Sequence, residues 1–444
     1  MREGSLDAPT RRPIDWQNPQ FYDEAALDAE LRRVFDICHG CRRCFNLCDS
    51  FPRLFTLVDE SESGELDAVP SKSFKSVVDA CTLCDMCFMT KCPYVPPHEF
   101  NVDFPHLMVR YRAAEFRRGE RDFVDKELAK TDRNGRLAGS IAGLANWATR
   151  RKNKLTRPAM EKIAGIDRDA AMPYFYYNTF ERRSARATPT INADAPAHGR
   201  KAVLYSTCFV NYNAPAVGQA TQHVLAKNGV ATKVVYPGCC GMPKLENGDL
   251  EGVAKAAAEV AAALTPYIDE GYDIIALTPS CALMLKFEWP LIAPGNDAVK
   301  KLSQATFDIA EYIVDIAKKE GLAAGLKPLP GHVAMHLACH ARAQNMGPKG
   351  AQMLELIPDS KISVIERCSG HGGKWGMMKE NFDTAIKVGK PAARQAIAVE
   401  AKFIASECPL AADHLAQGME KISEEEAPPR TYHPIELLAM AYGF

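Results

Sequence analysis

The hydrophobic pattern of the chain changes at about residue 201. From there on, short apolar runs rich in Val and Ile, such as KAVLYSTC and YDIIALTPSC, alternate with longer Ala-rich and charged segments such as DLEGVAKAAAEVAAALTPYI. The short runs predict buried strands, and the longer segments predict helices. Residues 201–444 are therefore expected to form α/β structure.

The strand-like runs occur as two sets of three, and each run ends at a cysteine. The first set ends at Cys208, at Cys239 and Cys240, and at Cys281, whereas the second ends at Cys339, Cys368 and Cys408. The first two cysteine positions are 31 residues apart in the first set and 29 in the second, counted from Cys208 to Cys239 and from Cys339 to Cys368. The next cysteine position, Cys281 or Cys408, follows after 42 and 40 residues. Coincidence explains this match poorly, so we infer an internal duplication with units at 201–330 and 331–444.

These cysteines fall at the carboxyl ends of the predicted strands, where open α/β sheets bind their ligands. A lone cysteine in an apolar run is commonly a small buried hydrophobe. Six repetitions at strand ends favour thiolates that converge on a metal or cluster.

The first hundred residues carry a different pattern, with two closely spaced cysteine quartets inside a predicted domain at 31–115. CHGCRRCFNLC follows C-x2-C-x2-C-x3-C, and CTLCDMCFMTKCP follows C-x2-C-x2-C-x4-C-P. Two-residue gaps let three thiolates reach one cubane cluster, and in two-cluster ferredoxins the fourth cysteine binds the other cluster. We therefore predict two [4Fe-4S] clusters, one on Cys38, Cys41, Cys44 and Cys92, the other on Cys81, Cys84, Cys87 and Cys48.

Zinc ribbons are the alternative, but they require two-plus-two spacing without a third cysteine two residues on. Asp49 stands where a proline commonly follows such a quartet, which alters the loop more than the ligands. Iron-sulfur ligation is the better interpretation of both quartets.

Composition narrows the functional classes. A length of 444 residues allows roughly three domains. Lys plus Arg is 54 and Asp plus Glu is 55, so the net charge of −1 gives no reason to expect a nucleic-acid partner. No stretch is long and apolar enough for a membrane span or a secretory signal, which predicts a cytoplasmic chain whose fifteen cysteines are ligands rather than disulfides.

Residues 1–30 are interpreted as an extension and residues 116–200 as a basic helical connector. Residues 110–160 hold 14 Lys or Arg against 6 Asp or Glu, and LAGSIAGLANWATRRKNKLTR predicts a helix whose apolar face includes Leu137, Ile141 and Leu144. Such a helix lies on an anionic membrane, or it packs on a neighbouring domain or partner protein. We favour packing.

Two quartets followed by paired C…CCG…C modules resemble the iron-sulfur subunits related to heterodisulfide reductase and to anaerobic glycerol-3-phosphate dehydrogenase, a layout shared with the glycolate oxidase iron-sulfur subunit. The resemblance extends from about Cys38 to the C-terminus, and CPYVPPHEFNVDFPHL is similar to a subgroup encoded near rubrerythrin in some bacteria. It implies a helical two-cluster ferredoxin-like domain followed by a duplicated α/β CCG-type domain. The CCG modules would hold a further iron-sulfur cluster or zinc.

The modules depart from the five-cysteine pattern of that family. Met284 replaces the last cysteine of the first module, and Ser369 and Ala411 replace two cysteines of the second. Four thiolates still suffice for a cluster or a zinc ion, whereas three leave a position open. The candidate metal ligands are Cys208, Cys239, Cys240, Cys281, Cys339, Cys368 and Cys408, with either His340 or His371.

His336 is a weaker candidate ligand, and for each histidine a hydrogen-bonded position near the sheet edge is an equally good interpretation. Gly241 and the group Gly370, Gly372 and Gly373 are expected to let the backbone turn closely around a cofactor, with ordinary tight turns as the alternative.

These features predict an electron-transfer subunit of an oxidoreductase, which passes electrons through two [4Fe-4S] clusters to a CCG site and on to a partner or quinone. No GxGxxG follows a strand, so a flavoprotein dehydrogenase would supply substrate oxidation. The alternatives are a soluble carrier for a rubrerythrin-type peroxide reductase and an enzyme that reduces a disulfide at the three-cysteine site.

Overall fold

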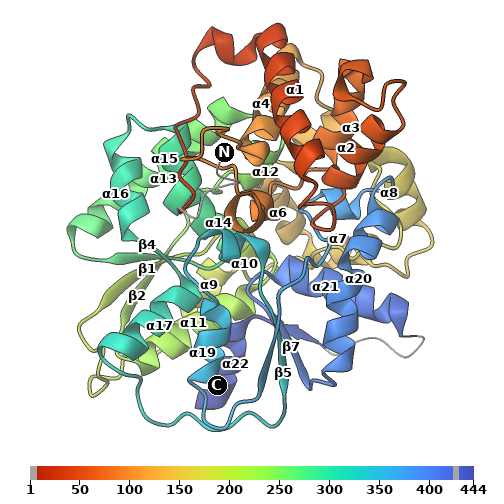
Figure 1. The fold of residues 1–444 in the computed structure, drawn as a ribbon. Coiled ribbons are helices and arrows are strands. Elements are labelled where there is room, and N and C mark those ends of the chain that lie inside the picture. Colours follow the sequence, from red (N-terminus) through yellow and green to blue (C-terminus); the bar gives the residue numbers. More distant parts are fainter. Residues whose placement is uncertain (1–7, 424–429) are drawn as a thin grey trace.

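The computed structural model describes residues 8–423 and 430–444, and two parallel sheets dominate its C-terminal half (Figure 1). The first has the order β2-β1-β3-β4, from β1 (Lys201–Tyr205), β2 (Ala231–Val235), β3 (Asp273–Ala276) and β4 (Thr306–Asp308). The second has the order β6-β5-β7-β8, from β5 (Val333–His336), β6 (Ile362–Ile365), β7 (Phe403–Ser406) and β8 (Thr431–Tyr432). The matching order confirms the predicted α/β duplication.

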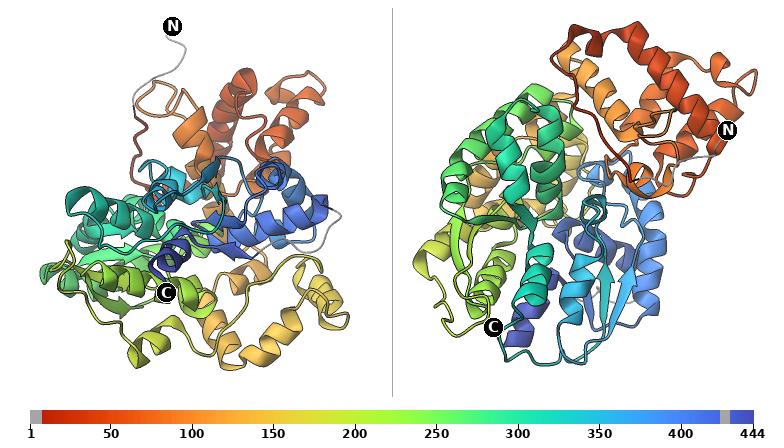
Figure 2. Two further views of the ribbon diagram at one scale, coloured as in Figure 1. Left: turned by 90° about the horizontal axis from the view of Figure 1, so that it is seen from below. Right: turned by 60° about the vertical axis from the view of Figure 1, so that its left-hand side comes forward.

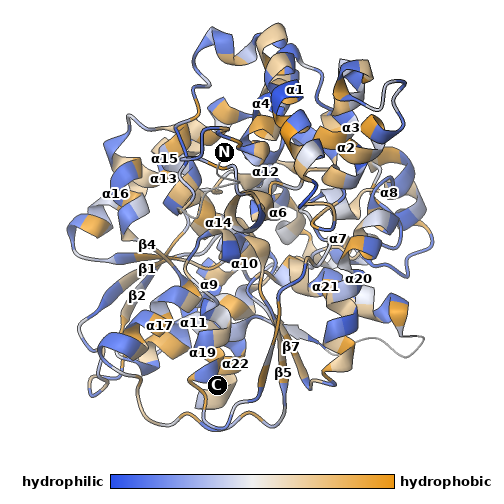
Figure 3. Ribbon diagram, viewed as in Figure 1, coloured by the Kyte–Doolittle hydropathy of each residue, from blue (hydrophilic) through white to orange (hydrophobic). Residues whose placement is uncertain are grey.

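The central strands are buried on both faces, as the continuous apolar runs predict. Every residue of β5 and β7 is buried, and Figure 3 colours these strands mostly as hydrophobic. Each sheet also has a fourth strand that the three-run pattern does not contain. β4 has three residues and β8 has two, so neither is long enough to produce an apolar run.

Helices from both modules pack between the two sheets and join them (Figure 1). The helices of this shared core are α11 (Pro215–Lys227), α17 (Ile309–Lys319), α19 (Lys349–Glu355) and α22 (Pro434–Tyr442). The remaining faces are covered by α13 (Leu250–Asp269) and α16 (Asp297–Ala305) in the first module, and by α20 (Phe382–Ala398) and α21 (Pro409–Ile422) in the second.

The N-terminal domain is helical, as expected. Its helices are α1 (Glu24–Cys41), α2 (Ser50–Asp59), α3 (Phe74–Asp79) and α4 (Phe104–Arg118). Phe35 meets Phe74 edge-on at 5.1 Å between ring centroids, and Phe51 lies 4.7 Å from Phe104. This core continues into the first module, so the domain packs firmly against it (Figure 2).

The connector contains α5 (Phe123–Leu128), α6 (Thr131–Ser140), α7 (Ala142–Thr149), α8 (Thr156–Ala164) and α9 (Phe180–Arg186). The single helix predicted around Leu137 is wrong, because the chain breaks at Ile141, whose φ is −119° and ψ is 37°. The prediction that its apolar face packs on a neighbouring domain is also wrong. Leu137 is 59% exposed and Leu144 60%, because the opposite face packs inward at Gly135, where any Cβ would overlap the ring of Tyr212.

An N-terminal arm straps the helical domain to the first module. Thr10 N donates to Pro96 O at 3.0 Å, and Ile14 N donates to Leu291 O at 2.8 Å. The Trp16 indole donates to Ile292 O at 2.7 Å. None of the described helices is long and apolar enough to cross a membrane.

Candidate functional site

A cavity of about 1430 Å³ lies where the carboxyl ends of both sheets meet the N-terminal domain. All fifteen cysteines are free thiols. Nine of them line this cavity, namely Cys48, Cys84, Cys208, Cys239, Cys240, Cys281, Cys339, Cys368 and Cys408. The cavity therefore joins Cys48 and Cys84 of the N-terminal domain to both α/β modules.

The first thiol group consists of Cys38, Cys41, Cys44 and Cys92. Cys38 and Cys41 lie in the last turn of α1, which ends at Arg42 in the left-handed conformation with φ 52°. Burial, followed by repulsion from the other three thiols, raises the pKa of Cys38 well above its usual value. Burial, followed by repulsion from Cys92 and Cys41, raises the pKa of Cys44 to about 12.

The second thiol group consists of Cys48, Cys81, Cys84 and Cys87. Burial and then repulsion from Cys84 and Cys81 raise the pKa of Cys48. Leu83 and Asp85 have φ of 48° and 61°, so the loop turns sharply on both sides of Cys84. In both groups the neighbouring thiols are those that the interlocked assignment places on one cluster. Binding of a cluster to either group stays a prediction.

Backbone N–H groups point at several of these sulfurs from two residues along the chain. The distance to sulfur is 3.4 Å from Gly241 N to Cys239 and 3.3 Å from Gly370 N to Cys368. The same relationship holds for Ser50 and Cys48, Leu83 and Cys81, Met86 and Cys84, and Tyr94 and Cys92. Such donors stabilise thiolates, and they are main-chain atoms that residue types alone do not reveal.

The chemistry of this donor set fits iron-sulfur clusters. Thiols that are buried together resist ionisation, and a coordinated metal supplies the positive charge that deprotonates them. Across residues 8–423 and 430–444, no three His, Cys, Asp or Glu side chains are placed to share one metal ion. A cubane cluster binds its thiolates through separate iron atoms, so it does not need that arrangement.

The four thiols of the first module converge at the end of its sheet. The sulfurs of Cys208 and Cys239 are 3.8 Å apart. Cys208 begins α10 (Cys208–Tyr212), Cys281 lies in α14 (Pro279–Leu283), and Cys281 neighbours Cys240. Met284, which stands in the place of a fifth cysteine, is fully buried.

The connector also reaches this site, which the sequence pattern did not predict. Thr131 Oγ1 donates to Cys239 Sγ at 3.2 Å, and Asp132 Oδ2 accepts from Cys239 N at 3.0 Å. Thr131 is 108 residues from Cys239 and lies in no cysteine motif, so only the fold reveals the contact.

The three thiols of the second module lie beside the second thiol group. Cys339 begins α18 (Cys339–Ala343), and Cys408 caps α21. Burial, then repulsion from Cys84, Cys368 and Cys408, raises the pKa of Cys339 well above its usual value. The Ser369 hydroxyl accepts a long bond from His371 N at 3.4 Å.

The candidate histidines differ in their hydrogen bonds. The ring nitrogens of His336 lie 3.0 Å from Ser406 Oγ and 2.9 Å from Arg367 O, so both are occupied. His340 Nε2 donates to Leu83 O at 3.2 Å. His371 Nε2 is buried without a hydrogen-bond partner among the described residues, and burial lowers the pKa of this imidazole to about 3. His371 is therefore a neutral imidazole among the residues that line the cavity.

The four glycines singled out in the sequence adopt left-handed backbone, which fits both a turn around a cofactor and an ordinary tight turn. Gly241, Gly370, Gly372 and Gly373 all have positive φ, between 55° and 83°. A Cβ on Gly370 would lie 2.0 Å from Ala385 O, so the loop after Cys368 passes too close to α20 for any other residue.

Comparison with known proteins agrees with this architecture. The cysteine-rich domain CCG matches residues 202–286 and 333–411. The chain is 28% identical over 326 residues to a subunit of the anaerobic glycerol-3-phosphate dehydrogenase of Escherichia coli strain K12, covering 72% of this chain and 77% of that protein. It is 29% identical over 192 residues to lactate utilization protein A of Geobacillus kaustophilus, covering 40% and 74%. It is 27% identical over 251 residues to a subunit of the fumarate reductase (CoM/CoB) of Methanothermobacter marburgensis, covering 55% and 47%.

Proposed function

Because residues 202–286 and 333–411 are cysteine-rich domains of the CCG type in a chain homologous to oxidoreductase subunits, we propose that this protein is an iron-sulfur electron-transfer subunit. The two N-terminal thiol groups would each hold a [4Fe-4S] cluster. The modules would hold a further iron-sulfur cluster, whereas the zinc alternative is disfavoured because no three described side chains are placed to share one ion. A flavoprotein dehydrogenase is the proposed redox partner, because the chain has no nucleotide-binding fingerprint.

The observation that carries this proposal is the contact between the second thiol group and the second module. His340 Nε2 donates to Leu83 O at 3.2 Å. Leu83 lies between Cys81 and Cys84, and His340 follows Cys339 directly. The thiol of Cys84 is also close enough to Cys368 for the two charges to repel. An electron that reaches the second group therefore has a short path into the second module.

The hydrogen bonds of the two histidines suggest a separate role for each. His340 would bridge the two sites through its Nε2–H, whereas His371, with an unpartnered Nε2, would complete the three-thiol site. A neutral imidazole is a usual metal ligand, and it fits a site that lost two cysteines.

Spectroscopy of the intact, anaerobically prepared protein tests the proposal. We expect low-temperature EPR signals after dithionite reduction, with iron confirmed by metal analysis and Mössbauer spectroscopy. Cys240→Ala should remove the signal of the first module and Cys339→Ala that of the second. Ser369→Ala is the matched control and should change neither signal. Ser369 stands where related modules have a cysteine, but it is not one of the proposed ligands. Reduced protein without any cluster signal would exclude electron transfer.

A second feature supports electron delivery at a membrane surface. Large apolar side chains are exposed along α6 to α8, namely Leu137, Ile141, Leu144, Trp147, Leu155 and Ile163. Exposed basic residues lie among them, namely Arg150, Arg151, Lys152 and Lys154. Apolar side chains flanked by cations suit an anionic lipid surface, from which quinone would be reached.

Vesicle flotation tests this surface. We expect the protein to float with phosphatidylglycerol vesicles and to sediment with phosphatidylcholine vesicles, and Trp147→Ser to weaken flotation. The triple variant Arg150→Gln, Lys152→Gln, Lys154→Gln should also lose binding, while Lys255→Gln, Lys300→Gln, Lys318→Gln removes exposed charge elsewhere and should bind normally. Absence of binding would favour the soluble carrier for a rubrerythrin-type reductase, and turnover of a small disulfide would favour the reductase alternative.

A further inference from the structure

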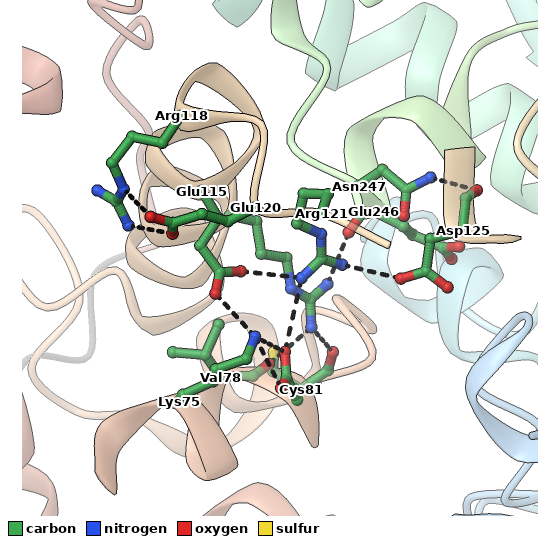
Figure 4. A network of polar contacts seen from close by, with 12 residues as sticks. Lys75, Val78, Cys81, Glu115, Arg118, Glu120, Arg121, Asp125, Glu246 and Asn247 are labelled. Atoms are coloured by element: carbon green, nitrogen blue, oxygen red, sulfur yellow. Dashed lines mark hydrogen bonds and ion pairs between the residues drawn. The ribbon is translucent and has the colours of Figure 1, made fainter. Parts of the chain in front are cut away.

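Arg112, in the middle of α4, is a buried cation whose hydrogen bonds all go to backbone carbonyls. The residues that supply these carbonyls, Val78, Cys81 and Glu246, are labelled in Figure 4. Its side chain lies where the N-terminal domain meets the first module, and the residue is only 5% exposed. Nη1 donates to Glu246 O at 3.1 Å, and Nη2 donates to Val78 O at 2.7 Å and also to Cys81 O. Three neutral acceptors hold the guanidinium without neutralising it.

The neighbouring Arg121 makes the contrast clear. Arg121 is ion-paired with Glu115 at 3.0 Å and lies 3.6 Å from both Asp125 and Asp79. Arg112 makes no ion pair with any described carboxylate, although Asp79 and Glu246 act on it from farther away. Arg112 therefore lacks a counter-anion among the described carboxylates. This is costly, because a buried charge is unfavourable unless an opposite charge compensates it.

The nearest candidate for that anion is the second thiol group. Arg112 Nη2 donates to the backbone carbonyls of Val78 and Cys81, and Cys81 is the first cysteine of that loop. The guanidinium therefore lies directly against the loop that carries the second thiol group.

The backbone of Arg112 is held by close packing. Gly248 follows α12 (Met242–Glu246) with φ 80°, and a Cβ there would lie 2.4 Å from the carbonyl carbon of Arg112. α4 thus touches the backbone of the first module, which fixes the point from which the Arg112 side chain extends.

The first thiol group has no comparable buried cation among the described residues. Lys91, which precedes Cys92 in the sequence, is exposed to solvent. Water screens an exposed ammonium far more than a buried guanidinium. The two groups therefore differ in electrostatic environment although their cysteine spacings are similar.

We propose that Arg112 raises the reduction potential of the centre held by Cys48, Cys81, Cys84 and Cys87 above that of the centre held by Cys38, Cys41, Cys44 and Cys92. The inference rests on the proposed function, since it gives that relay a direction. A reduced cluster carries one more negative charge than an oxidised one, and a fixed buried cation favours it. One electron from a flavoprotein partner reduces the first centre and leaves the partner oxidised. The electron then leaves the first centre oxidised and reduces the second, and no bond or proton is transferred.

EPR-monitored redox titration of the full-length protein tests the proposal. Arg112→Gln keeps hydrogen-bond donors but removes the charge, and it should lower the midpoint of the second centre alone. At the wild-type midpoint, the ratio of reduced to oxidised second centre should fall at least tenfold, which is 59 mV for one electron. Arg112→Lys keeps the charge and should stay close to the wild type.

Two further variants separate charge from packing. Arg121→Gln removes a buried arginine that carboxylates already neutralise, so both midpoints should stay in place. Glu246→Gln, measured at pH 8, removes a negative charge near Arg112 and should raise the second midpoint, which provides a test if Arg112→Gln retains too little iron.

Three outcomes would overturn the inference: equal shifts of both centres, no shift in Arg112→Gln together with none in Glu246→Gln, or the same shift in Arg112→Lys as in Arg112→Gln. Each of these leaves the electron-transfer function intact, because the clusters would still be present and reducible. Wild-type protein without cluster signals would instead contradict the proposed function.

Discussion

Arg11 donates two parallel hydrogen bonds to the carboxylate of Asp85, each 2.8 Å long. The same guanidinium reaches Asp103 at 3.0 Å and Glu288 at 2.9 Å, and it lies 4.3 Å from the centroid of the Phe88 ring. One side chain of the N-terminal arm thereby neutralises carboxylates from the second quartet loop, the start of α4 and the first module.

Replacing Arg11 by Met should strongly destabilise the protein. Asp85 and Glu288 are almost fully buried, and removing one partner of a buried ion pair costs about 3–5 kcal/mol. Anaerobic urea unfolding followed by circular dichroism measures the loss. The exposed Arg12→Met is the control and should stay within about 0.5 kcal/mol of the wild type. Equal stabilities for the two variants would contradict the role of Arg11.

Arg157 organises the connector, and its loss should loosen that segment. Its fully buried guanidinium donates to four carbonyls, those of Thr149, Asp167, Arg168 and Ala170. Arg157→Met leaves these acceptors unsatisfied, at about 1–3 kcal/mol for each that water cannot reach.

Limited proteolysis measures this loosening. Arg157→Met should be cleaved within 149–171 several-fold faster than the wild type, while the exposed Arg150→Met should match the wild type. Unchanged cleavage of Arg157→Met would mean that other contacts hold the connector.

His433 should make stability fall on mild acidification. It caps α22, with Nδ1 accepting from Ile435 N at 3.2 Å, and burial lowers the pKa of the imidazole to about 3. Because this pKa is depressed in the folded state, the neutral ring stabilises the fold above pH 6.5, and that contribution is lost as the pH falls from about 6.5 toward 3.

Between pH 7.5 and 6.0, His433 should account for about 0.8 kcal/mol of lost stability. His433→Asn retains a capping side chain but cannot titrate, so its urea midpoint should depend less on pH. The exposed His198→Asn should keep the pH dependence of the wild type. Identical slopes for His433→Asn and the wild type would rule out this contribution.

Gly370→Ala should remove the centre of the second module without affecting the N-terminal clusters. A left-handed backbone costs alanine about 1–2 kcal/mol, and the added carbon also meets the fixed oxygen of Ala385. The EPR signal that Cys339→Ala abolishes should disappear. Gly143→Ala, where a Cβ meets nothing within 4 Å, is the control and should retain every signal.

The features predicted correctly from the sequence are those with a local cause. The continuous apolar runs predict β1, β3, β5 and β7, because strands buried on both faces leave few polar positions. The edge strands β2 and β6 are only partly buried, and their Val and Ile content predicts them. The regular spacing of those runs predicts the duplication. The cysteines at strand ends, which β-strand geometry directs to one edge, predict which residues line the cavity.

The features that were missed depend on distant residues. The apolar face around Leu137 was expected to be buried, but Gly135 permits a closer approach to Tyr212 than any larger residue would. The contact of Thr131 with Cys239 and the isolation of Arg112 follow from how domains dock. No periodicity or spacing records such relationships, since the partners are 108 and 134 residues away.

The strap formed by the N-terminal arm also constrains the order of assembly. Arg11 is synthesised first, yet Glu288 lies 277 residues later, and Leu291 and Ile292 later still. The arm can contact Pro96, Asp85 and Asp103 as soon as the N-terminal domain is made, but its bonds to the first module must wait until that module has been synthesised and folded. The strap is therefore completed late, after the cysteines of both quartets have been synthesised.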